Sequence, residues 1–137
     1  MPKISFYLIE KKPLRRADLA CRLCQQIYQK HRIWLYFAEE SQLKEWDLAL
    51  WNTEPTASLP HAIDQLNQPI CLSLQPPNIS FDVCLNLTGQ VLPIAELSNN
   101  DIHVIEIIEN NEQDKQIARE RFKQYRTMGI EPIIHRI

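Results

Sequence analysis

The stretch IHVIEIIENNEQDKQIARERFKQYRTMGIEPIIHR, residues 102–136, contains the signals that decide the fold. It opens with an apolar run, IHVIEII, of the length and β-branched content typical of a buried strand. A polar segment with helical periodicity follows over residues 112–128, which we expect to begin at a cap on Asn110 or Asn111 and to stop at Gly129. The closing segment PIIHR predicts a last short strand. A strand, a helix and a strand in this order are typical of the parallel sheets of α/β proteins.

The same alternation of strands and helices runs through the rest of the chain. Apolar runs predict further strands over residues 4–9, 32–38, 70–74 and 82–87, and amphipathic patterns predict helices over residues 14–30 and from a cap at Ser41 to residue 51. Residues 52–69 hold three prolines and little periodicity, so we expect a loop there. The prediction is a single domain over residues 1–137, an α/β Rossmann-like three-layer domain with a mainly parallel central sheet and helices on both faces.

Charge and cysteine usage limit the classes of partner and the compartment. The net charge is −2, so an anionic partner has to meet a local basic patch and not a uniformly positive surface. We expect a cytoplasmic protein without a membrane segment, because no run of about 18 apolar residues occurs and the first residues lack a signal-peptide pattern. In that setting reduced, buried thiols are favoured over disulfides for the four cysteines, Cys21, Cys24, Cys71 and Cys84.

Nucleotide binding is the first function that a Rossmann-like sheet suggests, and the glycines argue against it. The chain has only Gly89 and Gly129, and neither follows the first strand, where a phosphate loop needs close approach of the backbone. The C-x-x-C pair of Cys21 and Cys24 falls in the middle of a predicted helix, which favours core packing over metal or redox chemistry. The four histidines are dispersed and stand beside no nucleophile motif. We therefore predict no cofactor, no metal site and no catalytic residues.

The helix predicted over residues 112–128 sorts its side chains into two faces at about 100° per residue. The sector expected to pack on the sheet contains Ile117, Ala118, Tyr125 and Met128. A sector of about 80° on roughly the opposite side contains four cations, here called the basic row: Lys115, Arg119, Lys123 and Arg126. Phe122 lies at the border between these sectors. Arg121 falls in the packed sector, where we expect it to have a local acidic or carbonyl partner.

Two interpretations of the basic row remain open at this point. It is either the solvated face of an amphipathic helix or a surface that holds an acidic, aromatic peptide. Asp114 and Glu120 lie mostly elsewhere around the helix, so regular Glu-to-Lys pairs do not neutralise the row. Arginine can grip carboxylates and the ring of Phe122 can wall an apolar pocket, as the second interpretation requires.

The helix sequence KQIARERFKQYRTMG resembles the C-terminal helix of the chi subunits of bacterial DNA polymerase III, which belong to the clamp-loader assembly. The likeness extends over nearly the whole chain through FYLIE, LALWN, LPH, LNL and VIEII, in that order. The resemblance implies a Rossmann-like fold without nucleotide binding and a non-catalytic adaptor role in DNA replication. One implied partner is the acidic, phenylalanine-ended C-terminal tail of the single-stranded DNA-binding protein. The other is the psi subunit, which tethers chi to the clamp loader, so DNA is reached only indirectly.

The resemblance also implies which residues bind the tail. By position the family's tail-binding site falls on Lys115, Arg119, Phe122 and Lys123, and the helical wheel adds Arg126. Arg119 is expected to hold a carboxylate of the tail, and the lysines to steer its acidic segment. Phe122 replaces the tyrosine of the enteric form, so the ring is kept and the hydroxyl is lost.

The psi-facing surface implied by the resemblance falls around the second helix and the loop after it. Its expected residues are Trp51, Leu59, Pro60 and His61. The family often has a phenylalanine where this chain has Ser58, which leaves open whether the second partner is psi or another protein such as a helicase. A direct single-stranded nucleic-acid binder using the same basic row is the alternative, although the acidic net charge and the single suitable ring argue against it.

Overall fold

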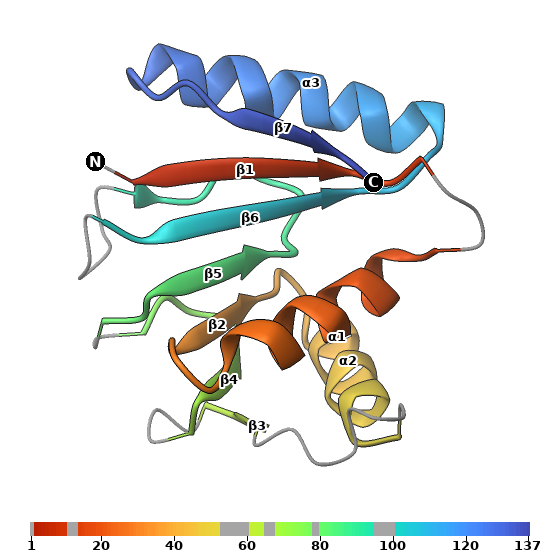
Figure 1. The fold of residues 1–137 in the computed structure, drawn as a ribbon, viewed down its shortest axis with the longest axis vertical. Coiled ribbons are helices and arrows are strands. Elements are labelled where there is room, and N and C mark those ends of the chain that lie inside the picture. The colour runs from red at the N-terminus through yellow and green to blue at the C-terminus, as the bar shows by residue number, and fades with distance from the viewer. Residues whose placement is uncertain (1, 11–13, 53–60, 65–67, 78–79, 95–100) are drawn as a thin grey trace.

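The computed structural model describes residues 2–10, 14–52, 61–64, 68–77, 80–94 and 101–137, without the side chains of residues 49–52 and 61. Its centre is a seven-stranded sheet in the order β3-β4-β2-β5-β6-β1-β7, and every pair of neighbours is parallel (Figure 1). The strands are β1 Lys3–Leu8, β2 Ile33–Tyr36, β3 His61–Ile63, β4 Ile70–Ser73, β5 Val83–Asn86, β6 His103–Ile108 and β7 Ile133–Arg136. The helices are α1 Arg16–Ile27, α2 Glu40–Asn52 and α3 Glu112–Thr127. The predicted α/β architecture is confirmed.

The central strands form because their side chains are apolar on both sides. In β4 and β5 every residue is buried, as expected of parallel strands that are covered on both faces. Successive side chains of β6 alternate between two separate clusters, so that Ile105 and Ile107 join one and Val104 and Ile108 join the other. The sheet therefore separates two hydrophobic cores.

The helices divide between these two cores. Leu19, Ala20 and Cys24 of α1 and Leu43 of α2 belong to the first core, whereas Ala118 and Tyr125 of α3 belong to the second. Figure 1 shows α1 and α2 together over the half of the sheet near β2, β4 and β3, with α3 at the other end beside β1 and β7. The predicted three layers, with helices on both faces, are confirmed.

The ends of α3 are set by local sequence signals. The Asn111 side chain accepts a hydrogen bond from the Asp114 N–H at 2.8 Å, so Asn111 is the predicted cap. At the other end Gly129 has φ +83°, and the N–H groups of Gly129 and Ile130 donate to the carbonyls of Arg126 and Tyr125 at 3.0 and 3.2 Å. This is the Schellman arrangement, which satisfies the last carbonyls of the helix and turns the chain towards β7.

Two local predictions are wrong. The loop expected over residues 52–69 contains β3, which pairs with β4 from His61↔Ile70 to Ile63↔Leu72. A strand of three residues is too short for a periodic signal, and it is held by its pairing with β4. Ser41 is not the cap of α2, because the helix begins at Glu40 and the Leu43 N–H donates to the Glu39 carbonyl.

The cysteine prediction is confirmed. All four side chains are buried and reduced. Burial, with a smaller effect from Asp18, raises the pKa of the Cys21 thiol, and burial raises the pKa of the Cys24 and Cys84 thiols as well. Thiols that resist ionisation in this way are poor nucleophiles and poor metal ligands. No cluster of three metal-ligating side chains occurs in the part of the chain that the structure describes.

None of the helices within the described ranges has the length and apolar character that a bilayer crossing needs.

Candidate functional site

A buried polar network fixes how α3 faces the sheet. Glu106 projects from the middle of β6 into the second core and is completely buried. One carboxylate oxygen accepts from Arg121 Nε at 3.0 Å, and the other accepts from Tyr125 Oη and Asn86 Nδ2, both at 2.7 Å. Arg121 also donates to the Gly89 carbonyl at 3.2 Å. Arg121 therefore has the expected local partners, the acidic side chain of Glu106 and the carbonyl of Gly89.

The electrostatics of this network follow from burial. Burial raises the pKa of the Glu106 carboxyl, while the Arg121 charge and the hydrogen bonds from Tyr125, Asn86 and Arg121 act against that rise. Burial, followed by the neighbouring Glu106 charge, raises the pKa of the Tyr125 hydroxyl. Tyr125 therefore remains a donor and holds the last turn of α3 on β6.

The network corrects the predicted orientation of α3. Ile117 and Met128, which we expected on the sheet, are 41% and 49% exposed. The buried residues of α3 are Ala118, Arg121 and Tyr125. Ala118, Arg121 and Tyr125 are thus buried in the predicted sector, whereas Ile117 and Met128 are not. The ion pair of Arg121 with Glu106 turns the helix slightly away from the predicted orientation, because the buried carboxylate needs a cationic partner.

The flank of α3 nearest β7 carries the predicted tail-binding residues. Phe122 is partly buried and its ring meets Phe6 of β1 edge to face, with centroids 5.6 Å apart. Residues 115, 119 and 122 recur at helical spacing, so Lys115 and Arg119 lie on the same flank as Phe122. Lys115 is half-buried there and Arg119 is exposed. Among the described residues neither cation has a carboxylate partner, and Arg119 donates only to Gln116 Oε1 at 3.2 Å. The structure therefore brings Lys115, Arg119 and Phe122 together.

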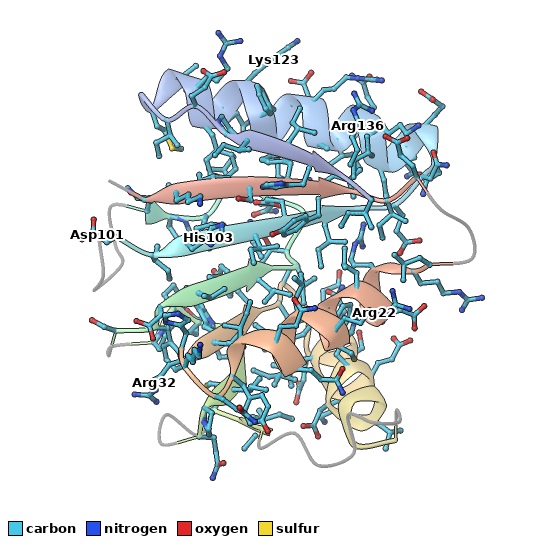
Figure 2. All side chains as sticks on the ribbon, viewed as in Figure 1. Arg22, Arg32, Asp101, His103, Lys123 and Arg136 are labelled. Atoms are coloured by element: carbon cyan, nitrogen blue, oxygen red, sulfur yellow. The ribbon has the colours of Figure 1, made fainter. Side chains whose placement is uncertain are left out.

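The other half of the basic row differs from the prediction, because its charges have acidic neighbours. Lys123 Nζ lies 3.9 Å from Glu120 Oε1, and Arg126 Nε lies 3.2 Å from Glu131 Oε2. All four side chains are exposed, so these pairs are weak and a charged ligand could displace them. Figure 2 shows Lys123 pointing away from the sheet on the outer side of α3. Lys123 and Arg126 thus flank the surface formed by Lys115, Arg119 and Phe122.

The residues expected to face psi fall largely outside the described part of the chain. Leu59, Pro60 and Ser58 lie outside the described residues. Trp51 is in the last turn of α2 and His61 begins β3, but the side chains of both lie outside the description. Leu48, three residues before Trp51, is 63% exposed on α2. The described surface of α2 therefore includes a large exposed apolar side chain close to the expected residues.

A pocket of about 470 Å³ lies on the opposite flank of α3, at the carboxyl ends of β2, β5 and β6. The sequence did not predict this pocket, which forms where the first turns of three helices converge. Its charged lining residues are Arg16, Glu39, Glu45, Asp114 and Arg121. Ligands of α/β sheets usually bind at this edge. Here both guanidinium groups are engaged, since Arg16 donates to Asp114 Oδ2 at 2.7 Å and Arg121 to Glu106, so the pocket offers little to a phosphate.

Comparison with known proteins assigns the family. The DNA polymerase III chi subunit family (HolC) matches residues 1–132. The chain belongs to the DNA polymerase III chi subunit family. A curated relative, the DNA polymerase III subunit chi of Pseudomonas aeruginosa, is 31% identical over 142 residues, covering 100% of this chain and 98% of the relative. The subunit chi of Haemophilus influenzae is 30% identical over 132 residues and covers 90% of each chain.

Membership places the chain among the subunits of the replicative DNA polymerase III, and the resemblance found in the sequence is confirmed. Protein partners within the polymerase complex follow from membership in the family.

Proposed function

We propose that this chi-family protein is a non-catalytic adaptor that links the clamp loader to the single-stranded DNA-binding protein. In this proposal α3 holds the acidic C-terminal tail of that protein, and a second surface around α2 holds psi. The observation that carries the proposal is the flank of α3 on which Lys115 and Arg119, without carboxylate partners among the described residues, lie beside the ring of Phe122.

The chemistry of this flank matches the chemistry of the tail. Arg119 is exposed and offers its guanidinium to two carboxylate oxygens at once, and Lys115 adds a second positive charge one turn earlier. Phe6 holds the ring of Phe122 at a fixed angle, interplanar 70°, so an aromatic side chain of the ligand meets a preset apolar wall. An acidic peptide that ends in phenylalanine satisfies both the charge and the ring.

The second surface is proposed from the family and from one described residue. Leu48 stands exposed on α2, and a large exposed apolar side chain beside Trp51 fits a protein contact. Psi is the partner we propose for it, and a helicase that competes for the same surface would bind by the same apolar contacts.

Direct binding of single-stranded nucleic acid is disfavoured by the α3 surface. Such binders lay several bases on several exposed rings along a basic groove. The basic flank of α3 presents one ring, Phe122, and that ring is partly buried against Phe6. A protein tail needs only one such ring.

The test is a calorimetric titration of the full chain with a synthetic acidic peptide that ends in phenylalanine. Wild type should bind it, and Arg119→Ala should bind it at least about tenfold more weakly, since a charge-assisted contact contributes roughly that much. Thermal stability should stay close to that of wild type, because Arg119 is exposed. The matched control is Arg22→Ala, which removes an exposed arginine of α1 on the other face of the sheet (Figure 2).

The control variant should bind the peptide as wild type does. Equal affinity of wild type and Arg119→Ala would show that the tail does not use this flank of α3. Equal losses of affinity in Arg119→Ala and Arg22→Ala would show that the peptide is held only by general attraction to positive charge.

A further inference from the structure

The strand β7 ends the sheet with an unused hydrogen-bonding edge. Its inner side pairs with β1, in the register Ser5↔Ile133 to Leu8↔Arg136. Just beyond it the Ile137 N–H donates to the Leu8 carbonyl at 2.9 Å, and the Ile137 carbonyl accepts from the Glu10 N–H at 2.6 Å. Backbone groups of successive residues in a strand point to alternate sides, so Ile133 and His135 also bond to β1. The N–H and C=O groups of Ile134 and Arg136 therefore point away from the sheet.

This edge is open to solvent in the described part of the chain. All four residues of β7 are exposed, and no described strand lies beyond it. Ile133 and Ile134 expose 46% and 51% of their surface, which is unusual for two adjacent isoleucines. Natural proteins usually protect such an edge with charges or cover, because it is a template for pairing with another chain.

The open edge adjoins the candidate tail-binding flank of α3. Ile134 stands beside Phe6 in the sheet register, and Phe6 carries the ring of Phe122 on the same face. The Arg126–Glu131 contact at 3.2 Å ties the end of α3 to the segment that leads into β7. Phe122 and Ile134 therefore contribute two apolar side chains to one surface, and Lys115 and Arg119 of α3 lie next to it.

We propose that the acidic peptide binds this protein as an eighth strand, added to the outer edge of β7. Its backbone pairs with the outward groups of Ile134 and Arg136, its apolar side chain enters between Phe122 and Ile134, and its carboxylates meet Lys115 and Arg119. Main-chain pairing gives affinity that is independent of side chains, and the ring and the cations select the sequence. The inference rests on the proposed function and adds the way in which the peptide is held.

Charge complementarity favours an acidic peptide over a second copy of this chain. Two copies paired edge to edge through β7 would bring two sets of α3 cations close together, since α3 lies beside β7 in each copy (Figure 1). Like charges in such positions oppose association. An acidic strand gains from the same cations.

Amide hydrogen exchange of the full chain, followed by NMR with and without saturating peptide, tests the pairing directly. The N–H groups of Ile134 and Arg136 should exchange at least about tenfold more slowly in the complex, whereas those of Ile133 and His135 should change little. Unchanged exchange at Ile134 and Arg136, in a sample where calorimetry shows the peptide bound, would overturn the strand addition and leave the proposed function intact. Absence of peptide binding to wild type would overturn both.

A scan with N-methylated peptides separates main-chain pairing from side-chain contact, and it uses the wild-type protein. Methylation at alternate peptide positions should weaken binding roughly tenfold, and methylation at the positions between them should have little effect. A uniform response along the peptide would contradict the inference. In the protein, Ile134→Pro removes an outward N–H that an edge strand can spare, whereas Ile134→Ala shortens the apolar side chain and keeps that N–H, so the proline variant should lose more affinity than the alanine variant.

Analytical ultracentrifugation of the chain alone tests whether a second copy of the chain, and not a peptide, occupies the edge of β7. A monomer is expected. A dimer whose Ile134 amide is already protected without peptide would show that a second copy occupies the edge, and would overturn the proposal.

Discussion

Glu106 lies in the middle of β6 with its carboxylate in the second core, where an uncompensated charge is costly. Three donors on two other elements compensate it: Arg121, Tyr125 and Asn86. Two of these donors belong to α3, so the network also selects which face of that helix turns inward. The exposure of Lys115 and Arg119 thus depends on a residue that touches neither of them.

Removal of the carboxylate by Glu106→Ala should lower the free energy of unfolding by about 3–5 kcal/mol, because it leaves the Arg121 guanidinium buried without its counter-charge. Urea denaturation at neutral pH measures this loss. Glu120→Ala on the exposed face of α3 is the matched control and should stay within about 0.5 kcal/mol of wild type. A loss of less than about 1 kcal/mol in Glu106→Ala would show that the network does not hold the helix.

His103, at the start of β6, predicts a pH dependence of stability. Its ring nitrogen Nε2 lies 2.8 Å from Ser5 Oγ, and burial, followed by the positive charges of Lys3 and His135, lowers the pKa of the imidazole. The folded state therefore binds a proton less readily than the unfolded chain does. The contribution of His103 to stability is fully present above the ordinary histidine pKa, at about 6.5. It is lost as pH falls from there through the lower pKa of the folded state.

Melting temperatures measured between about pH 7 and about pH 5 check this expectation. Wild type should lose more thermal stability over that interval than His103→Gln, which does not titrate. Glu106 is present in both proteins, so its own titration cancels in the comparison. Parallel curves for the two proteins would refute the assignment.

At the scale of the element, α3 depends on a glycine at its end. Gly129 has φ +83°, and a Cβ built on it meets nothing within 4 Å. Gly129→Ala should therefore destabilise the protein through backbone strain alone, by about 1–2 kcal/mol in thermal or urea unfolding. Gly129→Asn should cost less, because asparagine adopts the left-handed conformation more readily. Equal stability of the alanine variant and wild type would mean that the helix end can rearrange.

Most elements could be predicted because buried parallel strands are continuous apolar runs. The pattern is evident in ICLS of β4 and VCLN of β5, where every residue is buried. β3 could not be predicted, since its three residues are held by pairing with a strand that follows later in the chain. The ends of α3 were predicted because Asn111 and Gly129 act locally.

The rotation of α3 could not be predicted, because a helical wheel treats apolarity as burial. Arg121 was expected in the packed sector, but its partner Glu106 was not identified, since which strand lies beneath a helix is a property of the fold. A single acidic residue within the apolar run IHVIEII was the available signal. The flank with Lys115, Arg119 and Phe122 was predicted, whereas the Glu131 partner of Arg126 lies beyond the helix end and was not.

At the scale of the whole molecule, the two surfaces of the proposed adaptor lie at opposite edges of one sheet. The α3 flank adjoins β7, the last strand on one side, and α2 contacts β3, the last strand on the other (Figure 1). The five strands between them separate the two surfaces. Two partners bound in this way would not compete for space, which is what a linking subunit of a polymerase assembly requires.

Retention of intact single-stranded DNA-binding protein on the immobilised chain tests the central claim most directly. Wild type should retain the full-length protein and should fail to retain a version without its acidic tail, and Arg119→Ala should retain little of either. Equal retention of the tail-deleted version by wild type would contradict the account, because α3 would then not be holding a tail.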